Sequence, residues 1–285
     1  MSLDYKEAFD LYAGEHLKKV FATQSYQNAI RFGGEPSTIH FVVLRFKGLM
    51  TALQGMTPLD FLKCIHKLSE SIFPLVYNNG GWVHNFTIEF IELVFGENAS
   101  CTSVFDSISS IYSIMNEYSK TESFLSKINL ASSYFYGEVI YLNYGTSKRM
   151  FNDIIGENVD LARKLCGLCD YYGVTNISIL SQVENSFTEK QIRKLDTIKI
   201  SGTKKNYEVC EVCQNVSSRE ELDCINLFNK GVTLFKKKEW AKAILIFEKV
   251  LSNKKIDLPS QRYIKTCRQL IDVKPPNDWD GVFSF

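Results

Sequence analysis

The segment Gly81–Gly96 places one carboxylate, Glu89, between two apolar stretches. Its two halves favour extended strands around a tight turn, with Glu89 just past the turn. A carboxylate between apolar strands is costly to hold unless it faces water, a cation or a bound ligand. Glu89 is therefore the first candidate functional residue.

Eight cysteines include two pairs with the spacing of metal ligands, Cys166–Cys169 and Cys210–Cys213. A four-thiolate zinc site is one interpretation of these pairs. The other is that they are small buried hydrophobic side chains, because the first pair lies in a helical pattern and the second in an alternating strand. The surrounding residues favour the second interpretation.

The periodicity of apolar residues indicates the elements that must position these side chains. Helices are predicted over residues 4–31, from Thr57-Pro58 to about Leu75, over 103–120 and over about 157–172. Strands are predicted over 39–46, as a hairpin over 82–95, as a pair broken at Gly137 over 130–142, and near 175–180 and 206–213, with a polar segment between the last two. This order describes an α+β domain with one largely antiparallel sheet.

Residues 219–271 differ in character, and two helices are predicted there, over 225–235 and 240–251. A spacing typical of a tetratricopeptide-like hairpin is found at Gly231, Trp240, Ala243 and Phe247. One such hairpin cannot bury its own apolar face, so it should dock on the main domain or on a partner. The tail from Pro275 is predicted to be extended, with Trp279 filling a groove.

The bulk composition excludes several classes of function. The chain has 285 residues, and 45% of them are hydrophobic, which is enough for a substantial core. The net charge of +1 gives no basic face for nucleic acid. No apolar run reaches the roughly 18 residues that span a bilayer, and the start is unlike a signal peptide. We therefore expect a cytoplasmic chain that contacts neither nucleic acid nor membrane.

Three motifs occur in a fixed order along the chain. Gly33-Gly34-Glu35 precedes a strand that ends at Val43–Met50; Gly80-Gly81 is followed by Asn85–Glu89 and then by Val94–Gly96; the third motif is Phe151–Leu165. In this order and at these separations, they resemble the class III nucleotidyl cyclase family, the adenylate and guanylate cyclases. The resemblance covers roughly residues 15–213.

The resemblance implies a ferredoxin-like βαββαβ sheet covered by helices. It also implies three parts of the chain. Residues 1–36 would be a transducer-like helix and lead-in, 37–215 the cyclase homology domain, and 216–285 the helical hairpin with its extended tail.

In the cyclase family two divalent cations, Mg²⁺ or Mn²⁺, bridge the triphosphate of the nucleotide and need two carboxylates. The resemblance places Arg45 at the first carboxylate position and Glu89 at the second. A guanidinium has no lone pair to donate, and it repels a cation. Glu89 is thus the one metal-ligating carboxylate that remains.

The nucleotide-binding positions also depart from the family pattern. Asn85 stands where a Lys reads the purine, whereas Asp153 matches the residue that reads adenine, which favours ATP over GTP. Asp160 replaces the Asn that positions the ribose. Lys164 replaces the Arg that stabilises the transition state, so the charge is kept but the bidentate fork is lost. The late Lys that often contacts the terminal phosphates has no clear match here; Ser201 stands near that place, with Lys204 and Lys205 close by in the sequence.

Three functions follow from these substitutions, and the sequence leaves all three open. The first is a catalytically degenerate protein in cAMP signalling, acting as a regulatory or dimerising partner in a homodimer or a heterodimer with another cyclase chain. The second is an active adenylate cyclase that converts ATP to cAMP and pyrophosphate with Mg²⁺ or Mn²⁺. The third is an ATP-binding sensor without turnover.

The sequence also allows an interpretation in which Arg45, Glu89 and His84 have no part in chemistry. Arg45 and Glu89 are expected to form an ion pair that fills the vacated metal position. His84, beside the hairpin turn, is expected to lie on the surface.

Overall fold

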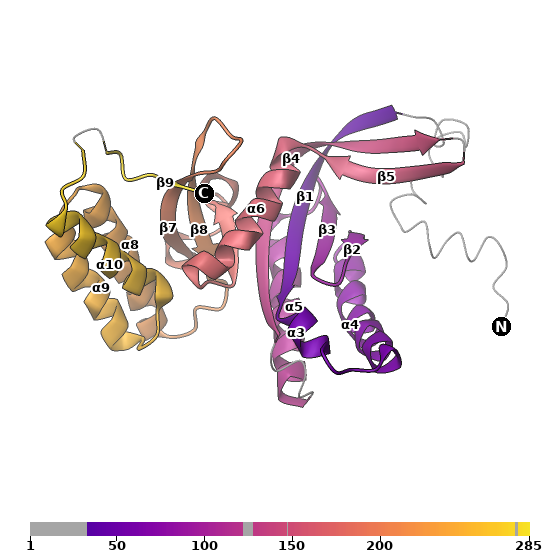
Figure 1. Ribbon diagram of the computed structural model, residues 1–285, viewed down its shortest axis with the longest axis horizontal. Coiled ribbons are helices and arrows are strands. Elements are labelled where there is room, and N and C mark those ends of the chain that lie inside the picture. The colour runs from indigo at the N-terminus through magenta and orange to yellow at the C-terminus, as the bar shows by residue number, and fades with distance from the viewer. Residues whose placement is uncertain (1–32, 122–127, 147, 277–278) are drawn as a thin grey trace. The chain divides into compact units, whose positions relative to one another are not determined.

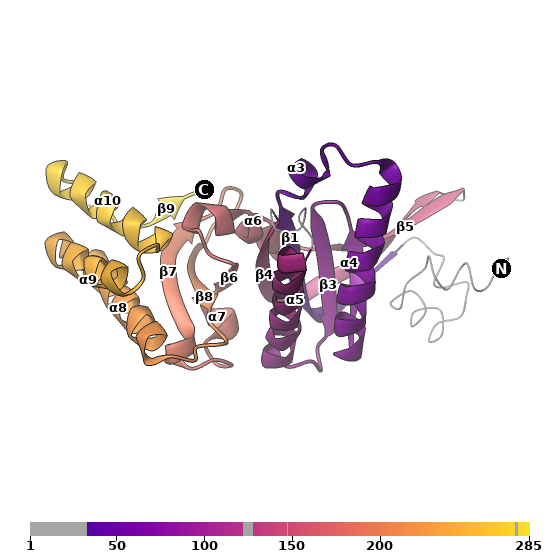
Figure 2. The ribbon, with the colours of Figure 1, turned by 90° about the horizontal axis from the view of Figure 1, so that it is seen from below.

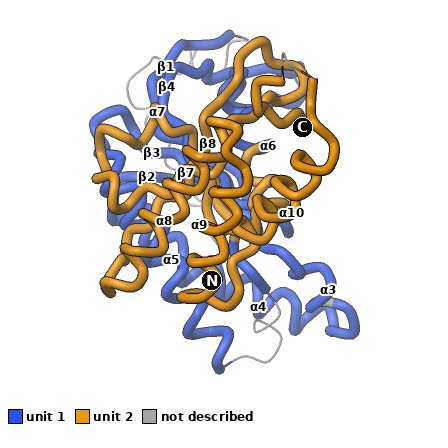
Figure 3. The backbone as a smooth tube through the Cα atoms, turned by 90° about the vertical axis from the view of Figure 1, so that its left-hand side faces the viewer, with its two compact units in different colours: residues 1–130, 134–163 blue, residues 131–133, 164–285 orange. Residues whose placement is uncertain are grey.

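The computed structural model describes residues 33–121, 128–146, 148–276 and 279–285. The helix predicted over residues 4–31 lies outside these ranges. Backbone contacts divide the described chain into two compact units, coloured separately in Figure 3. Unit 1 holds the described part of Met1–Leu130 together with Tyr134–Arg163, and unit 2 holds Ala131–Ser133 and Lys164–Phe285. The three-part division predicted from the sequence stays a prediction.

Unit 1 is built on sheet strands in the order β2-β3-β1-β4, in which β3 pairs antiparallel with both β2 and β1, and β5 pairs antiparallel with β4. Its elements are β1 (Gly33–Lys47), α3 (Leu49–Leu53), α4 (Pro58–Asn78), β2 (Gly81–Phe86), β3 (Phe90–Gly96), α5 (Cys101–Thr121), β4 (Asn129–Thr146), β5 (Arg149–Ile155) and the start of α6 (Glu157–Tyr172). Figures 1 and 2 show α4 and α5 on one face of this sheet. The predicted α+β fold with βαββαβ order is confirmed.

The central strands and the first helix of unit 1 follow directly from local sequence. Consecutive buried residues at 39–44 and 91–95 mark β1 and β3 as interior strands. Thr57 caps α4, because its hydroxyl oxygen accepts a hydrogen bond from the amide of Asp60 at 3.2 Å. Pro58 occupies the first helical position, as the sequence predicted.

The predicted break at Gly137 is wrong, because β4 runs without interruption from Asn129 to Thr146. Gly137 has a φ of 157°, and a Cβ added there would lie 2.5 Å from the ring of Phe135. The glycine therefore makes room for an aromatic ring within the strand and does not end it. The second half of β4 pairs antiparallel with β5, from Ile140 opposite Ile155 to Thr146 opposite Arg149.

Unit 2 contains a second set of strands, in the order β6-β8-β7-β9. Its elements, after the end of α6, are β6 (Asn176–Ile179), α7 (Leu180–Val183), a 3-10 turn (Glu189–Gln191), β7 (Ile192–Lys199), β8 (Asn206–Val212), α8 (Arg219–Lys236), α9 (Trp240–Asn253), α10 (Leu258–Asp272) and β9 (Phe283–Ser284). The prediction of a polar segment between the last two strands, before residue 206, is wrong, because this segment contains the strand β7. A bulge at Leu195, where the pairing with β8 shifts register, interrupts the alternation that would have revealed this strand.

Three helices, α8, α9 and α10, pack side by side in unit 2 (Figure 1). The sequence predicted the first two and missed α10. Asp257 caps α10 by accepting a hydrogen bond from the amide of Ser260 at 3.1 Å. The ring of Phe247 lies 2.7 Å from the place where Gly231 would carry a Cβ, so α8 and α9 approach closely. The tetratricopeptide-like assignment of this hairpin stays a prediction.

The C-terminal tail packs on the helices of unit 2. The ring of Trp279 lies 5.7 Å from that of Phe235 and 6.0 Å from that of Trp240, between centroids. Trp279 is half-buried against these rings, and the prediction that it fills a groove stays a prediction. Among the described residues, none of the helices combines the length and apolar character that a bilayer crossing requires.

Candidate functional site

The structure places Arg45 and Glu89 at the same end of two paired strands. Arg45 lies opposite Phe90 in the β1–β3 register, and the amide of Phe46 donates a hydrogen bond to the carbonyl of Glu89 at 2.9 Å. The guanidinium of Arg45 lies 5.8 Å from the centroid of the Phe90 ring. Glu89 is exposed in the turn, and its carboxylate makes no ion pair with any described residue. The expected ion pair between Arg45 and Glu89 is therefore not formed.

Asp153, on β5, contacts the hairpin through a histidine. Its Oδ1 atom lies 3.3 Å from Nε2 of His84 and also accepts a hydrogen bond from the amide of Ile154 at 2.8 Å. The predicted surface location of His84 is wrong, because its side chain is only 8% exposed. His84 sits at the irregularity in β2 between Val83 and Asn85, and such a bulge redirects a side chain. Asn85 itself is exposed.

An ion pair between a buried carboxylate and a partly exposed guanidinium joins β3 to α6. Arg163 donates from Nε to Oε1 of Glu92 at 2.6 Å and from a terminal nitrogen to Oε2 at 3.1 Å. The Glu92 side chain is 6% exposed, and the hydrogen bond to it raises the pKa of Arg163. Sequence reasoning missed this pair. The signal was a carboxylate within the apolar run of β3, which has to find a cation when it is buried.

Asp160 and Lys164 lie four residues apart on α6, and both are exposed. Within unit 2, the Nζ atom of Lys164 donates a hydrogen bond to the carbonyl oxygen of Ser201 at 3.1 Å. The structure thus brings together two residues that the sequence placed at phosphate-facing positions. The ammonium group of Lys164 is thus hydrogen-bonded to the turn between β7 and β8.

All four cysteines of the two pairs are free thiols, and the first pair contacts backbone carbonyl groups. The sulfur of Cys166 donates to the carbonyl of Ala131 at 3.7 Å, and that of Cys169 to the carbonyl of Ser132 at 3.4 Å. Burial raises the pKa of Cys169 well above its usual value. No cluster of three or more His, Cys, Asp or Glu side chains suited to a metal ion occurs in the described part of the chain.

Large apolar side chains are exposed along the paired strands β4 and β5, which we call the β4–β5 ribbon. Figure 1 shows the two strands. Large apolar side chains at least 36% exposed are found there at Tyr136, Ile140, Tyr144, Met150, Phe151 and Ile155. The rings of Tyr144 and Phe151 stack with centroids 5.5 Å apart. The register places Ile140 opposite Ile155 and Tyr144 opposite Phe151, so these four side chains share one face of the ribbon. Exposed apolar side chains gathered on one face commonly mark an interaction site.

Comparisons with known proteins identify the fold. No family model matches the sequence, and no curated protein matches it. Among solved structures, a bacterial light-regulated adenylyl cyclase has a TM-score of 0.64 at 12% identity, over 80% of this chain and 66% of that one. The guanylyl cyclase Cya2 has a TM-score of 0.54 at 17% identity, over 63% of this chain and 93% of that one. The adenylyl cyclase CyaB from P. aeruginosa has a TM-score of 0.55 at 13% identity, over 66% and 98%.

Proposed function

We propose that this chain, which has the fold of class III cyclases, is a catalytically degenerate member of a cyclic-nucleotide signalling system. It would act as a regulatory or dimerising partner and not as a cyclase. The observation that carries this proposal is Arg45. A guanidinium stands on β1 where the cyclase resemblance requires a metal-ligating carboxylate.

The residues present do not fit the two-metal site that the fold family implies. Arg45 cannot donate an electron pair to a cation, and its charge repels one. Its guanidinium lies near the ring of Phe90, in a contact that a cation would have to disturb. Glu89 is left as a single exposed carboxylate, whereas two ions held about 4 Å apart need carboxylates from both strands.

The positions expected to contact the nucleotide are engaged with the protein itself. Asp153 contacts His84, and Lys164 donates to the carbonyl of Ser201. A nucleotide would have to compete for both side chains. Asp160 adds a negative charge where the polyphosphate and ribose would lie, and Asn85 brings no charge to the purine position. These features support a chain that no longer turns over substrate.

The β4–β5 ribbon supports the dimerising part of the proposal. Its exposed apolar side chains would be covered by a second chain, either another copy of this one or a different cyclase chain. The cyclase resemblance implies that catalytic sites form between two subunits. A partner carrying both metal carboxylates could then complete one site, which this chain would modulate.

The decisive experiment incubates the purified protein with ATP and Mn²⁺ and measures cAMP. An Arg45→Ala, Glu89→Ala double variant serves as the blank, and GTP replaces ATP in a parallel reaction. We expect no cyclic nucleotide above the blank. A signal above the blank would overturn the proposal and support an active adenylate cyclase, in which Arg45 neutralises phosphate directly.

An ATP-binding sensor without turnover is the second candidate, favoured by Asp153 and by the positive charge of Arg45. A sensor would be stabilised by ATP in the absence of divalent cations, because a ligand that binds the folded state raises the melting temperature. The measurement is a thermal melt with ATP and EDTA. Asp153→Asn should abolish any stabilisation, whereas Asp106→Asn, an exposed position on α5, should not.

A further inference from the structure

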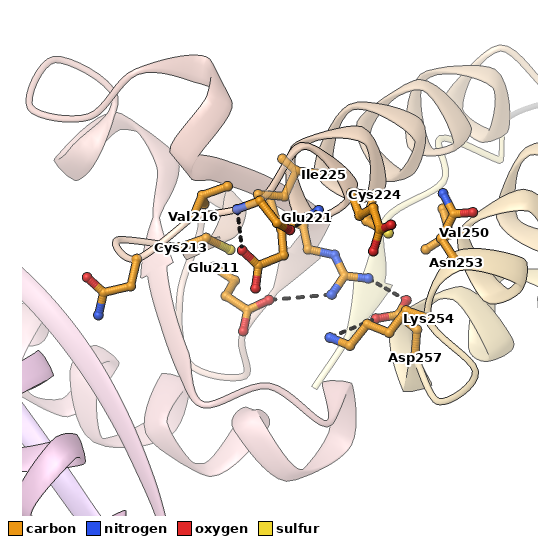
Figure 4. A pocket seen from close by; sticks show the side chains of 14 residues that line it. Glu211, Cys213, Val216, Glu221, Cys224, Ile225, Val250, Asn253, Lys254 and Asp257 are labelled. Carbon is orange, nitrogen blue, oxygen red and sulfur yellow. Dashed lines mark hydrogen bonds and ion pairs between the residues drawn. The ribbon is translucent and has the colours of Figure 1, made fainter.

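A cavity of about 520 Å³ lies within unit 2, and none of the residues that the cyclase resemblance places at nucleotide or metal positions lines it (Figure 4). It is bounded by β7 and β8, the loop after β8, the first turns of α8, the end of α9 and the turn before α10. This volume falls within the range of small-molecule sites, roughly 300–1,000 Å³. The cavity is therefore large enough for a ligand.

The floor of the cavity carries one guanidinium between two carboxylates. Arg193, whose side chain is 8% exposed, donates to Oδ2 of Asp257 at 2.5 Å, and its other terminal nitrogen lies 3.5 Å from Oε2 of Glu211. The dashed lines in Figure 4 mark both ion pairs. The ring of Phe228 lies 3.9 Å from the guanidinium carbon. Among the described residues, Nε of Arg193 has no hydrogen-bond partner.

The two carboxylates share this cation unequally. Burial acts to raise the pKa of Asp257, but Arg193 and Ser260 outweigh burial, and the pKa is lowered. Burial raises the pKa of Glu211, and the attraction of Arg193 does not offset it. Arg193 therefore stabilises the charge of Asp257 more than that of Glu211. The ionised form of Glu211 lacks a full counter-charge, and a cation in the cavity would supply one.

The rim adds further negative charge. Glu220 and Glu221 stand in the first turn of α8, where they counter the positive end of the helix dipole. The cavity lining holds four carboxylates, at Glu211, Glu220, Glu221 and Asp257, against two cations, at Arg193 and Lys254. Lys254 lies 3.8 Å from Oδ1 of Asp257. An anion would therefore be repelled, and a cation attracted.

The walls are apolar between the charged floor and the charged rim. Val216, Ile225 and Val250 line the cavity, together with the thiols of Cys213 and Cys224. An alkyl chain fits this surface, because it buries apolar area without leaving polar atoms unpaired.

We propose that this cavity binds a small aliphatic amine that also carries a neutral hydrogen-bond acceptor, such as an amino amide or an amino alcohol. The ammonium group lies beside Glu211, the alkyl chain runs along Val216, Ile225 and Val250, and the acceptor oxygen takes a hydrogen bond from Nζ of Lys254, which lines the cavity and whose side chain is 60% exposed. This site is independent of the function proposed above, so either can fail without the other.

A matched set of probes tests each recognised group. The probes are 6-aminohexanamide, hexylamine without the acceptor, hexanamide without the charge, and hexanoate with the opposite charge. Binding is followed by titration of the Ile225 and Val250 methyl signals in NMR spectra of the full chain. We expect 6-aminohexanamide to bind best, hexylamine to bind more weakly, and hexanamide and hexanoate to leave these signals unmoved.

Variants then locate the charge that recognises the amine. Glu211→Gln should weaken binding of 6-aminohexanamide by about tenfold or more. Glu220→Gln, at an exposed rim position that leaves the fold intact, should weaken it severalfold if Glu211→Gln does not fold. Glu248→Gln, an exposed change on α9 outside the cavity, is the matched control and should bind as the parent does. Equal binding of hexanoate, no shift with any amine, or unchanged binding in the folded Glu variants would overturn the proposal.

Discussion

Arg163 and Glu92 form a bidentate ion pair between α6 and β3, with N···O distances of 2.6 and 3.1 Å. Glu92 is almost fully buried and Arg163 is partly exposed, so the two partners differ in their access to solvent. The helix that this pair anchors also carries Asp160. The pair therefore fixes where a candidate site residue stands, although neither partner matches a nucleotide or metal position of the cyclase pattern.

Replacing Arg163 with Ala should lower the free energy of unfolding by about 2 kcal/mol, because Glu92 is left buried without a cation. The double variant Arg163→Ala, Glu92→Leu should recover part of that loss, since no uncompensated charge remains. Urea unfolding followed by circular dichroism measures both. Arg268→Ala, which removes an exposed ion pair on α10, is the control and should change stability by less than about 1 kcal/mol. Equal midpoints for all variants would show that the ion pair does not stabilise the fold.

Restoring a carboxylate at position 45 should restore metal binding. The β1–β3 register places position 45 opposite Phe90, and the Phe46 amide contacts the Glu89 carbonyl, so an Asp at 45 would share this end of the sheet with Glu89. We expect Arg45→Asp to bind Mn²⁺, seen as enhanced water-proton relaxation, and Arg45→Asn to bind none or far less. If both variants behave alike, the hairpin does not hold the geometry of a metal site.

Placing a charge on the β4–β5 ribbon should dissociate any dimer. Phe151 is 44% exposed there and stacks on Tyr144, so an Asp at 151 would put a carboxylate among the apolar side chains that the proposed partner would cover. Light scattering after gel filtration should give a monomer mass for Phe151→Asp. Leu245→Asp, an equally drastic change at an exposed position on α9, should leave the mass unchanged. If the parent protein is itself a monomer, the same measurement is made on its mixtures with a cyclase chain.

Stability should fall as the pH rises from 4 to 7, because of a buried carboxyl group in unit 2. Burial raises the pKa of Asp196 from 3.8 to about 7, although Tyr172 donates a hydrogen bond to it at 3.1 Å. Since the folded state holds this proton more tightly than the unfolded state, the stabilisation is complete below pH 4 and is lost as the pH passes 7. The loss attributable to this group is about 4 kcal/mol.

The variant Asp196→Asn removes this titration. We expect its urea midpoint to vary less than that of the parent between pH 5 and pH 8, and to exceed the parent's midpoint at pH 8. Asp272→Asn, at an exposed position near the end of α10, should follow the parent at both pH values. A parent midpoint that rises steadily over this range, with Asp196→Asn rising equally, would contradict the assignment.

Local sequence predicted the elements whose signals are local. The helix predicted from about residue 157 to 172 matches α6, because acidic residues open it and a glycine follows its end. The hairpin over 82–95 was equally clear from its glycines and its apolar strands. The bulge at Leu195 interrupts the alternation of β7, and this strand was not predicted. Nor was α10 predicted, although Pro259 in its first turn is compatible with a helix and Asp257 caps it.

The candidate site was predictable in position but not in contacts. The three motifs correctly placed Arg45 and Glu89 at one end of two paired strands. The partners of Asp153 and Glu92 come from distant parts of the chain, separated by 69 and 71 residues, so no local pattern could reveal them. The orientation of His84 depends on one irregular residue in β2, and such an insertion reverses the face that a side chain occupies.

The packing of Trp279 against Trp240 provides an intrinsic fluorescence probe of unfolding in unit 2. The chain contains three tryptophans, and two of them lie in contact within unit 2, while the third, Trp82, is buried in β2 of unit 1. A Trp240→Phe, Trp279→Phe variant would emit from unit 1 alone, and Trp82→Phe from unit 2 alone. Fluorescence can therefore follow the unfolding of each unit separately in the intact chain, without any added label.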